Sequence, residues 1–192
     1  MCQYLKNKNI FLLLPIGVVS LSSLCAFYLT EYTNTLQIGM ADITDIPLSY
    51  KILFKVSSTF SAIIPIILFL FLYLSSEIML NDFFGENVKK ETLLNILGVS
   101  FIPMLAHQYF FWYNILSYCN TANIKRIQDL ANMKFMFDLT LESFEYINLL
   151  CWGLVYLIPI LYFIYKDMNV FSTFISFLIP SSLTIFFYFI IQ

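Results

Sequence analysis

Hydrophobic positions along the chain fall into five long runs, and the short segments between them hold most of the charged residues. Each run has about 20 residues or more, and a helix of that length spans the roughly 30 Å hydrocarbon core of a bilayer. Runs of this length with few or no charges are typical of transmembrane helices. We therefore predict membrane-spanning helices over residues 10–30, 53–79, 93–118, 147–165 and 169–191.

The longest polar segment after the third run, residues 120–146, has a helical pattern of its own. Apolar side chains recur there at helical spacing, with charged residues elsewhere around the helix: Ile124, Ile127, Leu130 and Ala131. This pattern predicts an amphipathic helix lying in the membrane interface, and a helix packed on the ends of the spans explains it equally well. The sequence thus predicts an all-α integral membrane protein, a bundle of five transmembrane helices with one interfacial helix, in a single multi-pass membrane domain over residues 1–192.

The composition agrees with this class. Hydrophobic residues make up 60% of the chain and charged residues only 11%, far from the values of soluble domains. The net charge of −2 gives no electrostatic basis for nucleic-acid binding. Lys6 and Lys8 precede the first run as in a secretory signal, but the run is longer than a signal core and no small-x-small cleavage site stands out. We therefore expect an uncleaved first span.

Five spans place the two termini on opposite sides of the membrane. With the N-terminus inside, each side holds five basic residues, but the inner connections are much shorter and therefore denser in charge. Because short cytoplasmic loops are enriched in Lys and Arg, we expect a cytoplasmic N-terminus and a C-terminus outside. The inner basic residues are then Lys6, Lys8, Lys89, Lys90 and Lys166.

Each predicted span contains one proline: Pro15, Pro65, Pro103, Pro159 and Pro180. A proline inside a helix removes a backbone hydrogen bond and bends the helix, so a neighbouring helix must satisfy the freed carbonyl. The pattern predicts bent helices or a cavity, although proline is also generally more frequent in membrane helices. The second span also carries small residues that suit close helix packing: Ser57, Ser61 and Ala62.

The single histidine, His107, lies near the middle of the third span. An ionisable group at this depth is costly, so it is expected to face the bundle interior. With Gln108, Tyr109 and Asn114 it forms a candidate intramembrane polar site that relays protons or contacts a ligand. The alternative is a histidine bonded to a backbone carbonyl freed by a nearby proline, which would tie two helices together.

A second candidate site is the charged connection between the second and third spans. Its residues Glu86, Lys89 and Lys90 are a candidate surface for a cytosolic partner. The simpler interpretation is a solvated loop that caps a helix.

The sequence predicts no catalytic residue, no metal site and no cofactor. It contains no HExxH motif, no GxSxG motif, no Walker loop and no Rossmann glycine pattern, and one histidine excludes bis-histidine haem within the chain. The four cysteines, Cys2, Cys25, Cys119 and Cys151, show no CxxC spacing. Cys119 and Cys151 lie toward the same predicted outer side, so either a disulfide or two buried thiols fits them.

Several short motifs resemble those of the Yip family of five-span membrane proteins, which is named for binding Ypt/Rab GTPases and has many bacterial relatives. The resemblance covers residues 65–191 and is carried by Phe84-Gly85, Lys89-Lys90, Leu93 to Gly98, Ile102-Pro103, Trp152-Gly153-Leu154-Val155 and the Lys166-Asp167 turn. It implies the five-span architecture, the N-in, C-out topology, and a role as a helper subunit in membrane or export processes.

Two functional hypotheses follow from the sequence. The first is a non-enzymatic, Yip-like accessory subunit, whose partners would be membrane lipids and a larger membrane-protein complex such as an exporter. The second is a small transporter or lipid-handling protein with a cavity near His107. An intramembrane enzyme is a weaker third hypothesis, because no residue pattern indicates a reaction.

Overall fold

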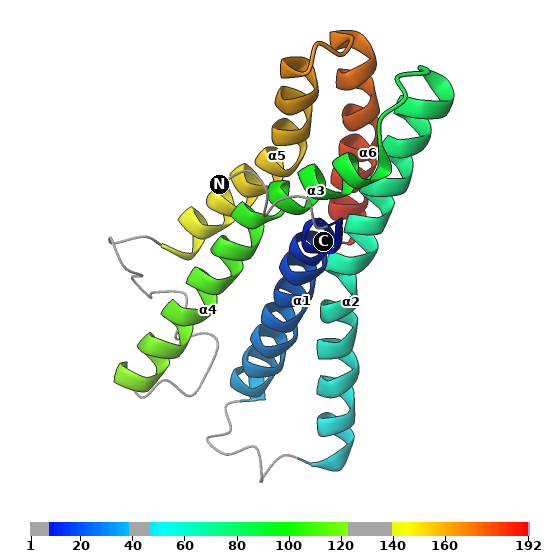
Figure 1. Cartoon of the computed structure of the whole chain (residues 1–192). Coiled ribbons are helices and arrows are strands. Elements are labelled where there is room, and N and C mark those ends of the chain that lie inside the picture. Colours follow the sequence, from blue (N-terminus) through cyan, green and yellow to red (C-terminus); the bar gives the residue numbers. More distant parts are fainter. Residues whose placement is uncertain (1–7, 39–46, 123–139, 192) are drawn as a thin grey trace. The chain divides into compact units, whose positions relative to one another are not determined.

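The computed structural model describes residues 8–38, 47–122 and 140–191, and these ranges are helical apart from short connections, without a strand (Figure 1). The helices are α1 (Lys8–Ile38), α2 (Leu48–Glu77), the π-helical turn η3 (Ile78–Phe83), α3 (Lys90–Ser100), α4 (Ile102–Ala122), α5 (Leu141–Tyr165) and α6 (Val170–Ile191). The all-α fold predicted from the sequence is confirmed.

Four helical stretches are long and apolar enough to cross a membrane: Leu13–Leu36, Leu48–Phe83, Lys90–Tyr118 and Ser143–Tyr165. The last helix, α6, has 22 residues and contains the shorter apolar stretch Val170–Leu183. The five apolar helices correspond to the five predicted spans, and the chain is an integral membrane helix bundle. The predicted interfacial helix lies almost entirely on residues 123–139, outside the described residues.

The third span differs from the prediction, because the helix is interrupted at Phe101 and divides into α3 and α4. Pro103 explains the interruption, since it has no N–H to donate to the carbonyl of Val99 one turn earlier. Pro103 is the second residue of α4, a position where the missing N–H costs little. The other four span prolines do lie inside helices, as expected.

The chain divides into two compact units. Unit 1 comprises residues 1–20, 66–103 and 152–192, and unit 2 comprises residues 21–65 and 104–151. Helices α1, α2, α4 and α5 therefore contribute residues to both units, and two of the boundaries fall directly after Pro65 and Pro103. The interpretation as one multi-pass domain stays a prediction.

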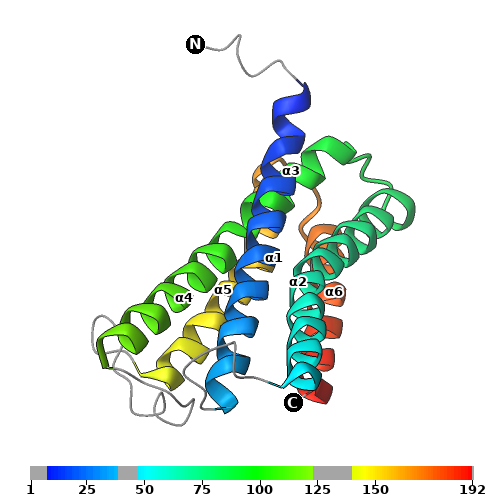
Figure 2. The same cartoon turned by 90° about the horizontal axis from the view of Figure 1, so that it is seen from below.

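In unit 1, α2 and α6 run side by side (Figures 1 and 2). The buried positions of α2 in this unit recur every three or four residues, which places them on one face of the helix: Phe69, Leu72 and Ser76. Aromatic rings extend this core, with centroid distances of 5.4 Å between Phe69 and Phe101 and 6.1 Å between Phe163 and Phe177. This face of α2 thus packs against Phe101, between α3 and α4, and against α6.

The core of unit 2 is built by one buried residue from each of three helices, Leu36 of α1, Ile115 of α4 and Phe144 of α5. Partly buried side chains surround it: Leu29, Tyr32, Phe110, Phe111 and Tyr118. Since lipid tails are as apolar as these side chains, close packing and polar links between helices must hold such a core together. The polar links of unit 2 come from the candidate site.

Candidate functional site

His107 links α4 to α5. Its Nε2 atom lies 3.2 Å from the carbonyl oxygen of Phe144, and its ring stacks on Phe111 with the two planes 6° apart. The contact is therefore that of a histidine bonded to a backbone carbonyl of a second helix, as one of the two interpretations predicted, with one correction. The residue one turn after Phe144 is Asn148 and not a proline, so the carbonyl is not one that a proline has freed. The second ring nitrogen, Nδ1, is buried and has no hydrogen-bond partner among the described residues.

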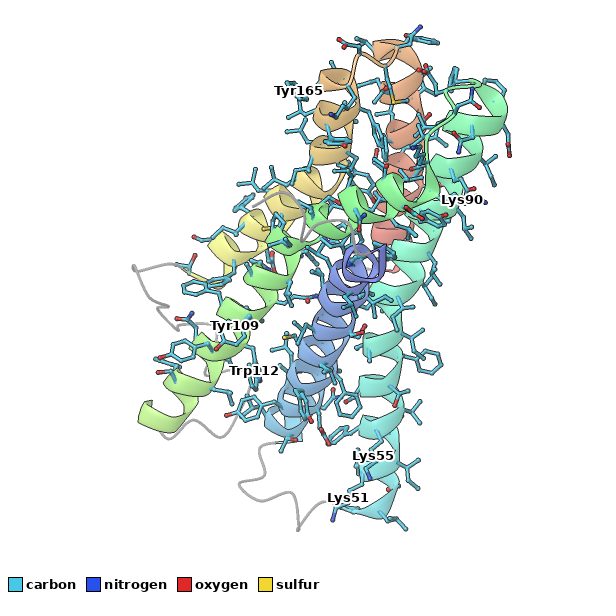
Figure 3. The ribbon with its side chains drawn as sticks, viewed as in Figure 1. Lys51, Lys55, Lys90, Tyr109, Trp112 and Tyr165 are labelled. Atoms are coloured by element: carbon cyan, nitrogen blue, oxygen red, sulfur yellow. The ribbon has the colours of Figure 1, made fainter. Side chains whose placement is uncertain are left out.

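The other three predicted residues of this site do not converge on His107. The Oε1 atom of Gln108 accepts a hydrogen bond of 2.6 Å from the hydroxyl of Ser22, which links α4 to α1. Asn114 is buried and donates through Nδ2 to the Phe110 carbonyl at 2.7 Å. Tyr109 is 56% exposed, and its ring contacts Trp112 on the same helix (Figure 3). The polar side chains are thus distributed around α4.

Asn148 of α5 lies one helical turn after Phe144, whose carbonyl contacts His107, and was not identified from the sequence. Its Oδ1 atom is buried and has no hydrogen-bond partner in the part of the chain that the structure describes. It follows Phe144 by one helical turn, so it projects from the same face of α5 that meets His107. The signal that could have identified it is an asparagine within an otherwise apolar run from Ile147 to Tyr165.

The second candidate site, the α2–α3 loop (residues 84–89), has a defined backbone. Asn81 brackets Val88: its Oδ1 atom accepts from the Val88 N–H at 2.5 Å, and its Nδ2 atom donates to the Val88 carbonyl at 3.1 Å. Gly85 and Asn87 adopt left-handed φ angles of 69° and 53°. Glycine and asparagine are the residues that tolerate this conformation best, so the local sequence suits the turn.

Two of the three predicted partner-binding residues are engaged within unit 1. The Oε1 atom of Glu86 accepts a 2.5 Å hydrogen bond from Ser172 near the start of α6, and Lys90 lies 2.7 Å from the carboxylate of Glu77. Lys89 is exposed, and so is Phe83, whose side chain is 73% exposed. The exposed residues of this surface include Phe83 and Lys89, and Lys90 is exposed as well despite its ion pair. Sequence reasoning missed Phe83 because it adjoins an apolar span.

The α2–α3 loop lies at the same end of unit 1 as the α5–α6 turn (Figure 1). The Glu86–Ser172 hydrogen bond joins the loop to the first turn of α6, directly after the α5–α6 turn, and the rings of Phe84 and Phe171 lie 6.4 Å apart. Tyr165, at the end of α5, is 80% exposed (Figure 3). Two connections that the five-span topology assigns to one side of the membrane thus meet in space.

Within the described residues, no group of three or more His, Cys, Asp or Glu side chains is placed to hold a metal ion. Cys25 and Cys151 are free thiols, while the side chains of Cys2 and Cys119 lie outside the described part of the chain. The predicted small-residue face of α2 is half-buried at Ser57, Ser61 and Ala62, and the neighbouring Ser58 is fully buried.

No family model, no curated protein and no solved structure matches this chain. The resemblance to the Yip family therefore rests on the sequence motifs alone.

Proposed function

We propose that the chain is a non-enzymatic accessory subunit of Yip type, which packs in the membrane against a larger complex such as an exporter. In this proposal the N-terminus is cytoplasmic, the C-terminus lies outside, and the α2–α3 loop is the cytosolic contact surface. The partner recognises Phe83 and Lys89, while Glu86 and Lys90 hold the loop in shape.

The observation that carries this proposal is the order of the α2–α3 loop. A loop that served only as a connection would need neither the two hydrogen bonds from the Asn81 side chain to the Val88 backbone nor the Glu86–Ser172 hydrogen bond. Holding a loop in one conformation before binding reduces the entropy lost on association. A defined loop that directly follows an exposed phenylalanine, Phe83 at the end of η3, is a favourable contact surface in a chain with little soluble part.

The use of polar side chains inside the helices also supports a packing role. Ser22 bonds to Gln108, Ser76 donates to the Ser176 carbonyl at 3.4 Å, and His107 contacts the Phe144 carbonyl. Each of these contacts joins two helices, which is how polar residues commonly stabilise membrane bundles. Groups committed to such links are poorly placed for chemistry on a substrate.

Extraction of a tagged chain from its native membrane in a mild detergent, followed by mass spectrometry, tests this proposal. We expect a large membrane protein to copurify in stoichiometric amount. Asn81→Ala, which loosens the loop, should reduce the recovered partner, whereas Ser182→Ala, at an exposed position of α6, should not. A chain that is recovered alone, or with lipid only, contradicts the proposal.

A second candidate function, a small transporter or lipid-handling protein, is favoured by one observation, the buried and unpartnered Nδ1 atom of His107. His107→Phe would remove this atom and keep most of the aromatic volume. Loss of a transport activity with intact assembly would support this candidate, and unchanged activity would exclude it.

A further inference from the structure

The exposed side of α5 has a uniform composition. Buried positions of this helix recur every four residues from Cys151 to Phe163, which places them on one face. Between Tyr146 and Tyr165, the exposed side consists of five leucines and one glycine: Leu149, Leu150, Gly153, Leu154, Leu157 and Leu161. We propose that this leucine face is a lipid-contact surface, and that Tyr146 and Tyr165 lie at the headgroup levels of the two leaflets. This inference does not depend on the proposed accessory function.

The length of the leucine face fits a bilayer. Tyr146 and Tyr165 are 19 residues apart in one continuous helix, which corresponds to about 28 Å at a rise of about 1.5 Å per residue. The hydrocarbon core of a bilayer is about 30 Å thick. The two tyrosines are therefore spaced along the helix as the boundaries of the two leaflets are.

Charged residues begin directly beyond the two tyrosines. Glu145 precedes Tyr146 and Lys166 follows Tyr165, both charged residues are exposed, and the sequence between them contains no charge. The Lys166 ammonium group lies 6.0 Å from the centroid of the Tyr162 ring and 5.9 Å from that of the Tyr165 ring. Tyrosine rings and lysine side chains at the end of a membrane helix are typical of the headgroup layer. The composition of both ends thus agrees with the spacing.

The side chains of the leucine face favour lipid over a second helix as the occupant. Helices that pack in membranes bring small residues together, commonly four positions apart, and join through polar side chains. Gly153 is the single small residue of the face, and the positions four residues before and after it are Leu149 and Leu157. The face carries no hydroxyl or amide side chain between the two tyrosines. Because acyl chains are as apolar as leucine, nothing on this face favours a protein over lipid.

The collision accessibility of spin labels tests this inference in the full chain. A ketone-bearing amino acid, introduced at one position at a time and labelled with a nitroxide, leaves the four native cysteines unchanged. The chain is extracted in a mild detergent together with any bound partner and reconstituted in lipid nanodiscs. Molecular oxygen, which dissolves in acyl chains, and nickel ethylenediaminediacetate, which stays in water, are the two collision reagents. The labelled positions are three leucines of the face and the two charged residues at its ends: Leu150, Leu157, Leu161, Glu145 and Lys166.

Trp152 is the control position, because it is half-buried on the same helix and its ring contacts Phe101. We expect higher oxygen collision rates at the three leucine positions than at Trp152. The ratio of oxygen to nickel collisions should be highest at Leu157 and fall toward both charged positions. Rates as low as at Trp152 with both reagents at the leucine positions would mean that a protein covers the face, and would overturn the inference. A ratio that is highest at a charged position would overturn it as well. Leu149 and Leu154 replace a leucine position at which the label prevents folding.

Discussion

Gly98 of α3 lies directly against Pro15 of α1: a Cβ atom built on Gly98 would lie 2.7 Å from the Pro15 Cα atom. Both residues are buried and belong to unit 1. Small residues at such crossings allow the backbones of membrane helices to approach closely. The absence of a side chain at Gly98 is thus what permits the contact between these two helices.

Gly98→Ala should therefore destabilise the protein, by about 1–3 kcal/mol as for other overpacking substitutions. The obstructing atom belongs to the backbone, so no side chain can rotate away. Thermal unfolding in detergent measures the effect. Gly153→Ala is the control, since no atom of the described residues lies within 4 Å of a Cβ atom at Gly153, and alanine there should stabilise α5 slightly. Equal melting temperatures for the two variants would contradict this explanation.

Gly85 tests a different property of glycine. A Cβ atom at Gly85 would meet no described atom within 4 Å, but the φ angle of +69° at this position is costly for residues with a side chain. Gly85→Ala should lower the free energy of unfolding by about 1–2 kcal/mol through backbone strain alone. Limited proteolysis should then cut the α2–α3 loop faster than in the wild type. Unchanged cleavage would mean that the loop relaxes without cost.

The hydrogen bond from Ser76 to the Ser176 carbonyl predicts a coupling with Pro180. That carbonyl lacks its helical donor because residue 180 is a proline, and Ser76 of α2 supplies one at 3.4 Å. Ser76→Ala should lower the free energy of unfolding by about 0.6 kcal/mol, an average value for hydrogen bonds between membrane helices.

In a Pro180→Ala background, the new N–H satisfies the carbonyl, and the cost of Ser76→Ala should largely disappear. A double-mutant cycle in reversible unfolding measures this difference. Ser75→Ala serves as the control, since the Ser75 hydroxyl bonds within α2 to the Phe71 carbonyl. Strictly additive effects of the two substitutions would show that Ser76 does not act on the proline-freed carbonyl.

Ser172→Ala should loosen the α2–α3 loop. The hydroxyl donates to the Glu86 carboxylate at 2.5 Å, and hydrogen bonds to charged groups contribute about 1.5–3 kcal/mol. Amide hydrogen exchange in residues 84–88 should accelerate at least about tenfold. Ser182→Ala, which removes only a bond to the Ile179 carbonyl within α6, should leave these rates unchanged. Equal exchange rates in both variants would show that the Ser172–Glu86 hydrogen bond does not stabilise the loop.

The sequence predicted the helices well because a bilayer demands long apolar segments with internal backbone hydrogen bonds. It did not predict the break at Phe101, since Pro103 within an apolar run looks like a proline inside one span. It also pointed to Gly85 and Gly98 through the family resemblance, and the structure adds physical reasons for both. Gly85 needs its left-handed backbone, and Gly98 needs to lack a side chain.

The candidate sites were less predictable, because their contacts join residues far apart in the chain. Glu86 and Ser172 are separated by 86 positions, and no local pattern connects them. An ionisable histidine inside the membrane has a high free-energy cost, which makes His107 a candidate from the sequence. A neutral asparagine such as Asn148 gives no comparable signal. Tyr109 was grouped with His107 by its position in the sequence, although adjacent helical residues point in different directions.

Site-specific photo-crosslinking in the native membrane tests the central claim, that the α2–α3 loop binds a larger membrane complex. A photoreactive phenylalanine analogue would replace Phe83 of η3, and Phe60 within α2, 66% exposed, would be the control position. We predict one defined protein adduct from position 83 that weakens when Lys89→Glu is added, and no such adduct from position 60. Adducts with lipid only at position 83, or the same adducts at both positions, would contradict the accessory-subunit function.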